Sequence, residues 1–191
     1  MFSGITAGTA KHLQLDAGVY IKNYDLSKDF AGNKANILGA TANGGSFSAV
    51  PTVRHVELDG RKGSVKGFER VDEWTVTMTA NVKELTAENI QIALAAAKKE
   101  AVTQNPAGYS KITGKPDIED SDYINNIAWV GRISGSQKPV IIIIYNALAT
   151  NGLSLSPTDK NEGVVPITLT GHFDVDNLDK VPFDILYPDI T

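Results

Sequence analysis

The residues from Phe68 to Val82 alternate between two kinds of position, and this is the most regular pattern in the chain. One set becomes apolar towards its end and consists of Phe68, Arg70, Asp72, Trp74, Val76, Met78, Ala80 and Val82. The other set is polar and rich in threonine: Glu69, Val71, Glu73, Thr75, Thr77, Thr79 and Asn81. A period of two over about fifteen positions is typical of a β-strand with one packed face and one solvent-exposed face.

This strand is longer than the core of a small domain requires, because strands usually contain about five or six residues. A second strand-like segment precedes it, so residues 53–82 are predicted to form a long hairpin with its tip at 59–68. Glycines and basic side chains make the tip flexible and positively charged: Gly60, Arg61, Lys62, Gly63, Lys66 and Gly67. We expect contacts from outside the protomer to hold the far end of this hairpin.

The segment 86–102 has the one clear helical pattern in the chain. Thr86 is a favourable N-cap, and Glu88 lies near the positive end of the helix dipole. Small apolar residues recur at helical spacing on one side: Ile90, Ala93, Leu94, Ala97 and Ala101. We predict a helix over 86–102 that packs closely against a sheet.

The remaining pattern is that of further strands. Residues 126–188 contain several, and the segment Val140 to Leu148 is apolar on both parities, which predicts a central strand covered on both faces. Asn43-Gly44-Gly45 predicts a turn between two short strands, and Pro51 indicates an edge position. The predicted fold is therefore mainly β (α+β): a single domain over 1–191, built as a β-sandwich or partial barrel with one packed helix.

Residues 1–36 are rich in Gly, Ser, Thr, Asn and Asp, which predicts a partly extended N-terminal arm. Tyr20, Tyr24 and Phe30 are aromatic anchors within it. Two interpretations stay open: the arm lies on a neighbouring subunit, or it packs on its own domain.

Composition excludes several classes of protein. The chain has no cysteine, and 18 basic against 22 acidic residues give a formal net charge of −4, without a basic stretch that fits nucleic-acid phosphates. The longest apolar run, Val140 to Tyr145, is far shorter than the roughly 20 residues of a membrane helix. We expect a soluble, unprocessed protein that binds no membrane and no DNA tightly.

Residues for catalysis or metal binding are scarce. His12, His55 and His172 are far apart in sequence, and no nucleophile-elbow motif occurs, so we predict no enzyme and no cofactor. Two acidic segments resemble calcium loops without the full ligand pattern: Asp117, Glu119, Asp120 and Asp122, and then Asp174, Asp176 and Asp179. We expect the first to be a solvated acidic loop and the second to be a polar exit from a strand into a loop.

Two parts of the chain resemble the major tail tube proteins of long-tailed bacteriophages and prophages. In residues 55–95 an extended strand leads to an Asp-Gly loop (59–67), a second long strand and a helix that opens with Thr86-Ala87-Glu88-Asn89. Near the end, the resemblance lies in Gly163-Val164-Val165-Pro166-Ile167-Thr168-Leu169, then His172 and Pro182-Phe183-Asp184-Ile185. Together these parts cover a little over half of the chain.

The resemblance implies a structural protein of the virion tail, assembled in the cytoplasm of a host bacterium. Such proteins form stacked hexameric rings that surround a conduit for DNA ejection, and their other partners are the tail terminator, the tape measure and the baseplate hub. It implies a ring-stacking loop of Asp59, Gly60, Arg61, Lys62, Gly63, Val65, Lys66 and Gly67. It also implies an inter-subunit arm, with Tyr20, Tyr24 and Phe30 as its anchors.

The lumen of such a tube lets DNA pass without sticking, so polar and acidic groups are expected there. The candidates are Glu69, Glu73, Thr75, Thr77 and Thr79, with Thr168, Thr170 and Asp174 as a second set. The opposite face, with Arg70, Asp72 and Trp74, is the alternative, and Arg70 and Asp72 are then expected to pair across a subunit boundary.

Two other functions stay open from the sequence. One is a tube subunit of a phage-tail-like bacteriocin or injection particle, which shares the general fold. The other is a monomeric ligand- or carbohydrate-binding β-sandwich that uses the acidic loop 117–122 with calcium.

Overall fold

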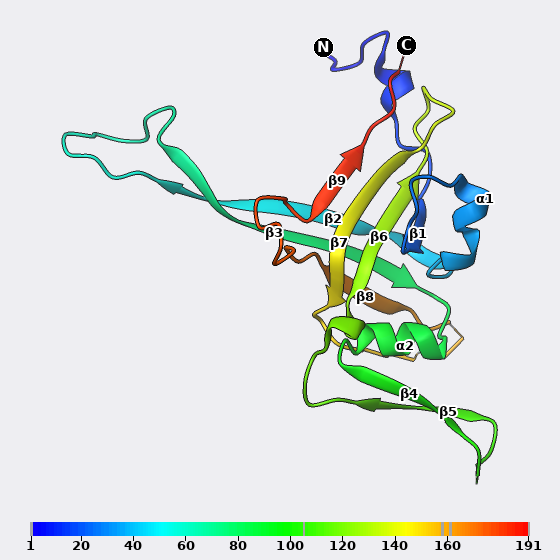
Figure 1. Cartoon of the computed structure of the whole chain (residues 1–191). Helices are drawn as coiled ribbons and strands as arrows, with labels where there is room; N and C mark the ends of the chain where they lie inside the picture. The colour runs from blue at the N-terminus through cyan, green and yellow to red at the C-terminus, as the bar shows by residue number, and fades with distance from the viewer. Residues whose placement is uncertain (1, 105, 158, 161, 191) are drawn as a thin grey trace.

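The computed structural model describes residues 2–104, 106–157, 159–160 and 162–190, and the fold is mainly β (Figure 1). The strands are β1 (Val19–Lys22), β2 (Thr41–His55), β3 (Glu69–Val82), β4 (Ala97–Val102), β5 (Tyr109–Gly114), β6 (Ile124–Gly131), β7 (Val140–Ala149), β8 (Val165–Thr170) and β9 (Phe183–Leu186). Two short helices, α1 (Phe30–Asn33) and α2 (Ala87–Ala93), and three 3-10 turns, η1 (Thr9–His12), η2 (Lys34–Asn36) and η3 (Asp120–Asp122), complete the described elements. None of the helices in this part of the chain is long and apolar enough to cross a membrane.

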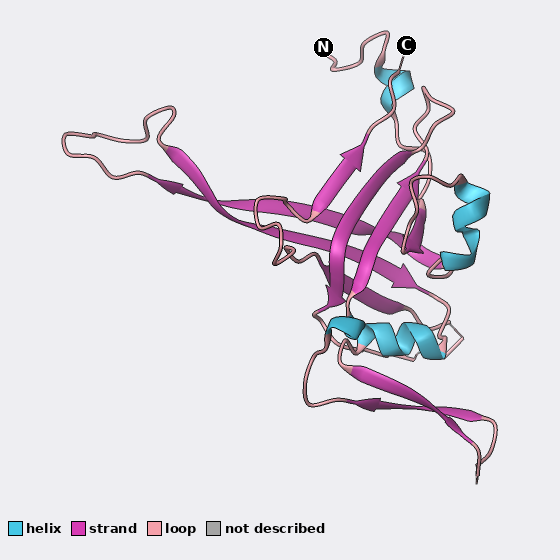
Figure 2. Ribbon diagram, in the orientation of Figure 1, coloured by secondary structure: helices cyan, strands magenta, loops and turns pink. Residues whose placement is uncertain are grey.

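Seven strands form one antiparallel sheet in the order β1-β6-β7-β8-β3-β2, with β9 also paired to β7. One edge of β7 pairs with β6 over most of its length. Its other edge is shared, because residues 141–144 pair with β9 and residues 148–149 pair with β8. The sheet therefore folds over at β7, and β2 and β3 cross the strands β6 and β7 as a second layer (Figure 2).

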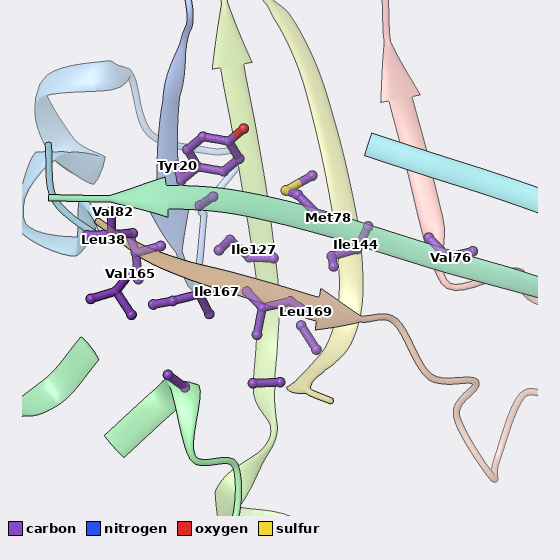
Figure 3. Close-up of a cluster of buried hydrophobic side chains, with 14 residues drawn as sticks. Tyr20, Leu38, Val76, Met78, Val82, Ile127, Ile144, Val165, Ile167 and Leu169 are labelled. Atoms are coloured by element: carbon purple, nitrogen blue, oxygen red, sulfur yellow. The ribbon is translucent and has the colours of Figure 1, made fainter. Parts of the chain in front are cut away.

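The main core lies between the two layers (Figure 3). On β3 the buried side chains are Val76, Met78, Ala80 and Val82, which confirms the alternation predicted for this part of the strand. On the far side of β6 and β7 a second cluster contains Ile21, Ala128, Val130 and Ile143. Because Ile144 belongs to the first cluster and Ile143 to the second, β7 is covered on both faces, as its sequence predicts.

The helix predicted for residues 86–102 is wrong in its second half. Thr86 is the N-cap, and its Oγ1 accepts a hydrogen bond from Asn89 N at 3.1 Å, but the helix ends at Ala93. Ala95 then takes a positive φ of 59°, and residues 97–102 form β4, which pairs with β5. This pairing with a segment later in the chain overrides the helical propensity of the alanines and lysines. α2 still packs on the core, through Ala93.

The N-terminal arm packs on its own domain at β1, which pairs with β6. Tyr20 is 2% exposed in the main core, so its assignment as an anchor on a neighbouring subunit is wrong. Tyr24 is partly buried against the second cluster, whereas Phe30 is 47% exposed at the start of α1. Of the three predicted anchors, Phe30 is the one whose side chain is largely open to solvent.

The predicted turn at Asn43-Gly44-Gly45 is instead an irregularity within the long strand β2. Asn43 and Gly44 have φ values of 58° and 63°, and the register with β3 shifts between Thr41 and Gly45. A Cβ atom at Gly45 would lie 2.0 Å from Thr79 O and 2.2 Å from the Tyr20 hydroxyl. Glycine at this position therefore lets β2 approach both the neighbouring strand and the core.

We predict that Gly45→Ala lowers the free energy of unfolding by about 1–3 kcal/mol, because the added methyl group meets backbone. Chemical denaturation measures this. Gly63→Ala in the hairpin tip is the matched control, since no atom lies within 4 Å of the added Cβ, and a change within about 0.5 kcal/mol is expected. Equal effects of the two substitutions would contradict the close packing at Gly45.

Candidate self-assembly surface

The distal part of the β2–β3 hairpin projects from the body as a two-stranded ribbon (Figure 2). β8 pairs with β3 over residues 77–82, and Gly171 N donates one further hydrogen bond to Val76 O at 2.9 Å. From Thr75 back to Glu69, which lies opposite His55, β3 pairs with β2 alone in the described part of the chain. β2 itself is the terminal strand of the sheet. Among the described residues, no further strand pairs with either edge of the ribbon.

Aromatic side chains attach the root of the ribbon to the body. The Trp74 and Phe47 rings lie 5.5 Å and 5.8 Å from the Phe183 ring, both in tilted arrangements. Phe183 begins β9, in the other layer of the sheet. These contacts fix the direction in which the ribbon leaves the body.

A β-bulge divides the ribbon into two segments with opposite parity. Thr52 lies opposite Glu73, but the next residue of β2, Val53, lies opposite Val71, so Asp72 is the extra residue. Residues directly opposite each other share a face, and alternation along β2 continues. Val71 and Glu69 therefore lie on the face opposite to that of Glu73.

Ion pairs on both sides of the ribbon agree with this assignment. Arg54 Nε donates to Asp72 Oδ1 at 2.8 Å on the same face as Thr52, and His55 lies 3.6 Å from Glu69 on the other face. The predicted pairing of Arg70 and Asp72 across a subunit boundary stays a prediction, but both side chains have partners within the hairpin. Asp72 binds Arg54 of the same hairpin, and Arg70 donates to the carbonyl oxygens of Gly67 and Glu69.

One face of β2, β3 and β8 carries mostly hydroxyl groups, and we call it the hydroxyl face. Its hydroxyl members are Ser46, Ser48, Thr52, Thr75, Thr77, Thr79, Thr168 and Thr170, which the strand register places on the same side. Val50 lies among them, and Arg54 and Arg70 lie on this side beyond the bulge. Thr79 Oγ1 lies 2.9 Å from Thr168 Oγ1, and Thr170 Oγ1 lies 2.8 Å from Thr150 Oγ1. The face thus offers polar groups, several already paired with each other, and Glu73 is its acidic member.

The structure brings together most of the residues predicted to line a lumen. Glu73, Thr75, Thr77 and Thr79 share the hydroxyl face with Thr168 and Thr170. Two residues lie elsewhere. The bulge places Glu69 on the opposite face, and Asp174 follows β8 in a turn, where it bridges to Asn177.

The tip of the hairpin spans residues 56–68, slightly more than the predicted 59–68. Most of the predicted loop residues are exposed, and Arg61 is partly covered because its guanidinium binds Glu57. Two apolar side chains are also open to solvent, Leu58 at 48% and Val65 at 42%. Sequence reasoning singled out Val65 but missed Leu58, whose position beside Asp59-Gly60 was the available signal. The tip therefore combines exposed basic and apolar groups.

The acidic loop 117–122 holds its own counter-ion. Lys115 Nζ donates to Glu119 Oε2 and to Asp122 Oδ1, both at 2.8 Å. These carboxylates raise the pKa of Lys115. Within the described residues, no group of three or more His, Asp or Glu side chains is arranged to hold a metal ion.

No protein-family model matches the chain, and no curated protein matches it. Inferences about function therefore rest on the ribbon, its faces and its tip.

We predict that trypsin cleaves the folded protein first at Lys62 or Lys66, because both lie in an exposed loop tip. Mass spectrometry of early digests identifies the cut. In the matched variant Lys62→Gln/Lys66→Gln, the first cleavage is expected to be slower or to move to another site. A first cut in β6 or β7 of the unaltered protein would contradict the exposed tip.

Proposed function

We propose that this protein is a structural, non-catalytic subunit of a phage tail tube. Copies assemble into hexameric rings, and the rings stack into a hollow conduit for DNA ejection. The observation that carries this proposal is the ribbon, whose strands continue beyond the core of their own protomer and keep both edges unpaired.

The unpaired edges favour pairing between copies. A long open strand edge presents N–H and C=O groups to any other strand, and proteins normally shorten, charge or cover such edges. β2 is 15 residues long, and its distal half carries exposed Val50 and Val53. Closure of a ring of identical subunits covers these edges with a defined partner.

Exposed apolar side chains support self-association at further places. In the N-terminal segment, Phe2 and Ile5 are 108% and 78% exposed, and Phe30 lies open on α1. At the hairpin tip, Leu58 and Val65 are exposed. Apolar groups at the end of a projecting element are typical of surfaces that a partner covers.

The hydroxyl face is the surface best suited to line the conduit. DNA binds proteins chiefly through cationic contacts to its phosphates. Between Thr75 and Thr79 the hydroxyl face has no basic member, and Glu73 adds a negative charge that repels phosphate. Arg54 and Arg70 lie on the same side beyond the bulge, where Arg54 is paired with Asp72. DNA can therefore pass along the part of the face between Thr75 and Thr79 without being retained.

The tube of a phage-tail-like bacteriocin or injection particle is the second candidate, since the same free edges and tip serve any stacked tube. A monomeric calcium-dependent binding sandwich has less support, because Lys115 already occupies two carboxylates of the acidic loop. In the phage setting, the subunit assembles in the bacterial cytoplasm and resides in the virion tail. Its other partners there are the tail terminator, the tape measure and the baseplate hub.

We predict that the purified protein forms rings or long hollow filaments as its concentration is raised, which electron microscopy detects. Deletion of Arg61–Lys66 is expected to abolish stacking and leave the fold intact, because these residues lie beyond the last strand pair. A second variant replaces the six residues with a Gly-Ser linker of the same length, so that loss of side chains is separated from loss of length. A protein that stays monomeric at every concentration would contradict the proposed function.

Assignment of the lumen gives a second prediction. The chain has no cysteine, so Thr77→Cys introduces a single reactive thiol on the hydroxyl face. In the protomer, this thiol is expected to react with a small maleimide and with one carrying a long polyethylene glycol chain. In assembled tubes, the large reagent is excluded while the small one still enters.

Tyr109→Cys on the separate β4–β5 hairpin is the control and reacts with both reagents in the protomer, since Tyr109 is 64% exposed. A gel shift after labelling measures the reaction. If Thr77→Cys in assembled tubes reacts equally with both reagents, the hydroxyl face does not line the lumen.

A further inference from the structure

A groove of about 490 Å³ lies beside the root of the ribbon, and we call it the ribbon-base groove. β3 contributes Val71 and Trp74 to it, and the segment after β8 contributes Phe173, Leu178, Asp179 and Val181. Several apolar side chains of this surface are left uncovered by the hydrophobic core. Val71 is 52% exposed and Leu178 is 68% exposed, and Val175 of the same segment is 84% exposed. An apolar cluster this open is typical of a surface that binds a partner.

The border of the groove is acidic. Glu73 and Asp179 line it, and Asp174 and Asp176 lie in the same segment as Leu178. Of the basic side chains close in sequence, Arg54 is paired with Asp72, and Lys180 Nζ lies 4.5 Å from the centre of the Tyr145 ring. Glu73, Asp174, Asp176 and Asp179 outnumber Lys180 and Arg70, so the charge around the apolar floor is net negative.

The hairpin tip has the complementary composition. Leu58 and Val65 are its exposed apolar side chains. Lys62 and Lys66 are exposed, and neither forms an ion pair in the described structure. Residues 58–67 contain three basic side chains and one carboxylate, Asp59; Arg61 is paired with Glu57, which leaves Lys62 and Lys66 to carry the positive charge of the tip. Basic and apolar groups on the tip thus match an acidic border and an apolar floor in the groove.

We infer that the ribbon-base groove binds the hairpin tip of a second copy of this chain. The tip does not reach the groove of its own protomer, because strand pairing continues to His55 and Glu69 and Val56 N donates to Phe68 O at 2.8 Å. These bonds keep the tip directed away from the body (Figure 1). The inference rests on the proposed function and adds the surface that receives the tip.

The contact joins two different surfaces, so it leaves a free tip on one copy and a free groove on the other. Such heterologous contacts propagate into open chains unless they close into a ring. A contact of this kind therefore gives the direction in which one layer of subunits is added to the next.

Disulfide cross-linking tests the contact, since the natural chain has no cysteine. Val65→Cys and Leu178→Cys are made as separate variants, mixed and oxidised. The inference predicts that only the mixture gives an abundant disulfide-linked dimer, because each variant alone lacks one half of the pair. A mixture of Val65→Cys with Tyr109→Cys is the control and is expected to give none.

The double variant Val65→Cys/Leu178→Cys distinguishes failure of the inference from failure of the proposed function. A ladder of trimers and larger species on a denaturing gel supports both. Dimers alone would keep the contact but contradict the tube, because they indicate a closed two-fold pair. Filaments without any cross-link would overturn the contact alone, and a monomer without cross-links would overturn both.

Charge reversal gives a second test that does not depend on thiol geometry. Lys62→Glu/Lys66→Glu or Asp176→Lys/Asp179→Lys is expected to raise the concentration for half-maximal filament formation about tenfold, from two lost ion pairs. Combining both reversals in one chain is expected to restore assembly. Lys98→Glu/Lys111→Glu on the β4–β5 hairpin is the control and should leave it unchanged. No recovery in the combined variant would contradict direct pairing of tip and groove.

Discussion

The structure depends on the unequal pairing of β3. Over residues 77–82 this strand lies between β2 and β8 and buries one face in the core. That segment is therefore hydrogen-bonded along both edges and packed on one face. Further out, β3 pairs with β2 alone among the described residues, and the aromatic contact of Trp74 attaches the root of the ribbon to the body. A two-stranded ribbon has little stability by itself in water. The distal hairpin is therefore ordered by its root and left open for contacts along both edges.

The sequence predicted the parts of the hairpin that burial constrains. Val76 to Val82 alternate because each second side chain must enter the core, and a slip of one residue would expose all of them. From Glu69 to Asp72 no core imposes this requirement. The residue types still alternate there, but the bulge at Asp72 reverses the faces on which the side chains lie. The wrong assignment of Glu69 follows from this difference. The alternation of residue types assigns a side chain to a face only where one face is buried.

The other errors have a similar cause, because the deciding contacts are distant in sequence. Ala97 to Val102 fit a helix locally, yet hydrogen bonds to residues 109–114 make them a strand. Tyr20 appeared to be a free anchor in a polar arm, but pairing of β1 with β6 carries it into the core. For the candidate site, the basic tip was visible in the sequence. The proximity of Val71 and Leu178 was not, because it needs the path of the chain after β8.

The small net charge of the chain conceals an uneven distribution that the fold creates. Basic groups gather at the tip, carboxylates surround the ribbon-base groove, and hydroxyl groups occupy one face of β3 and β8. On that face, the pairs Thr79–Thr168 and Thr150–Thr170 use hydroxyl groups that would otherwise be free to donate to phosphate. If the protein acts as a conduit, weak attraction for DNA then has two physical sources. From Thr75 to Thr79 the face lacks cations, and its hydrogen-bond donors are partly satisfied within the sheet.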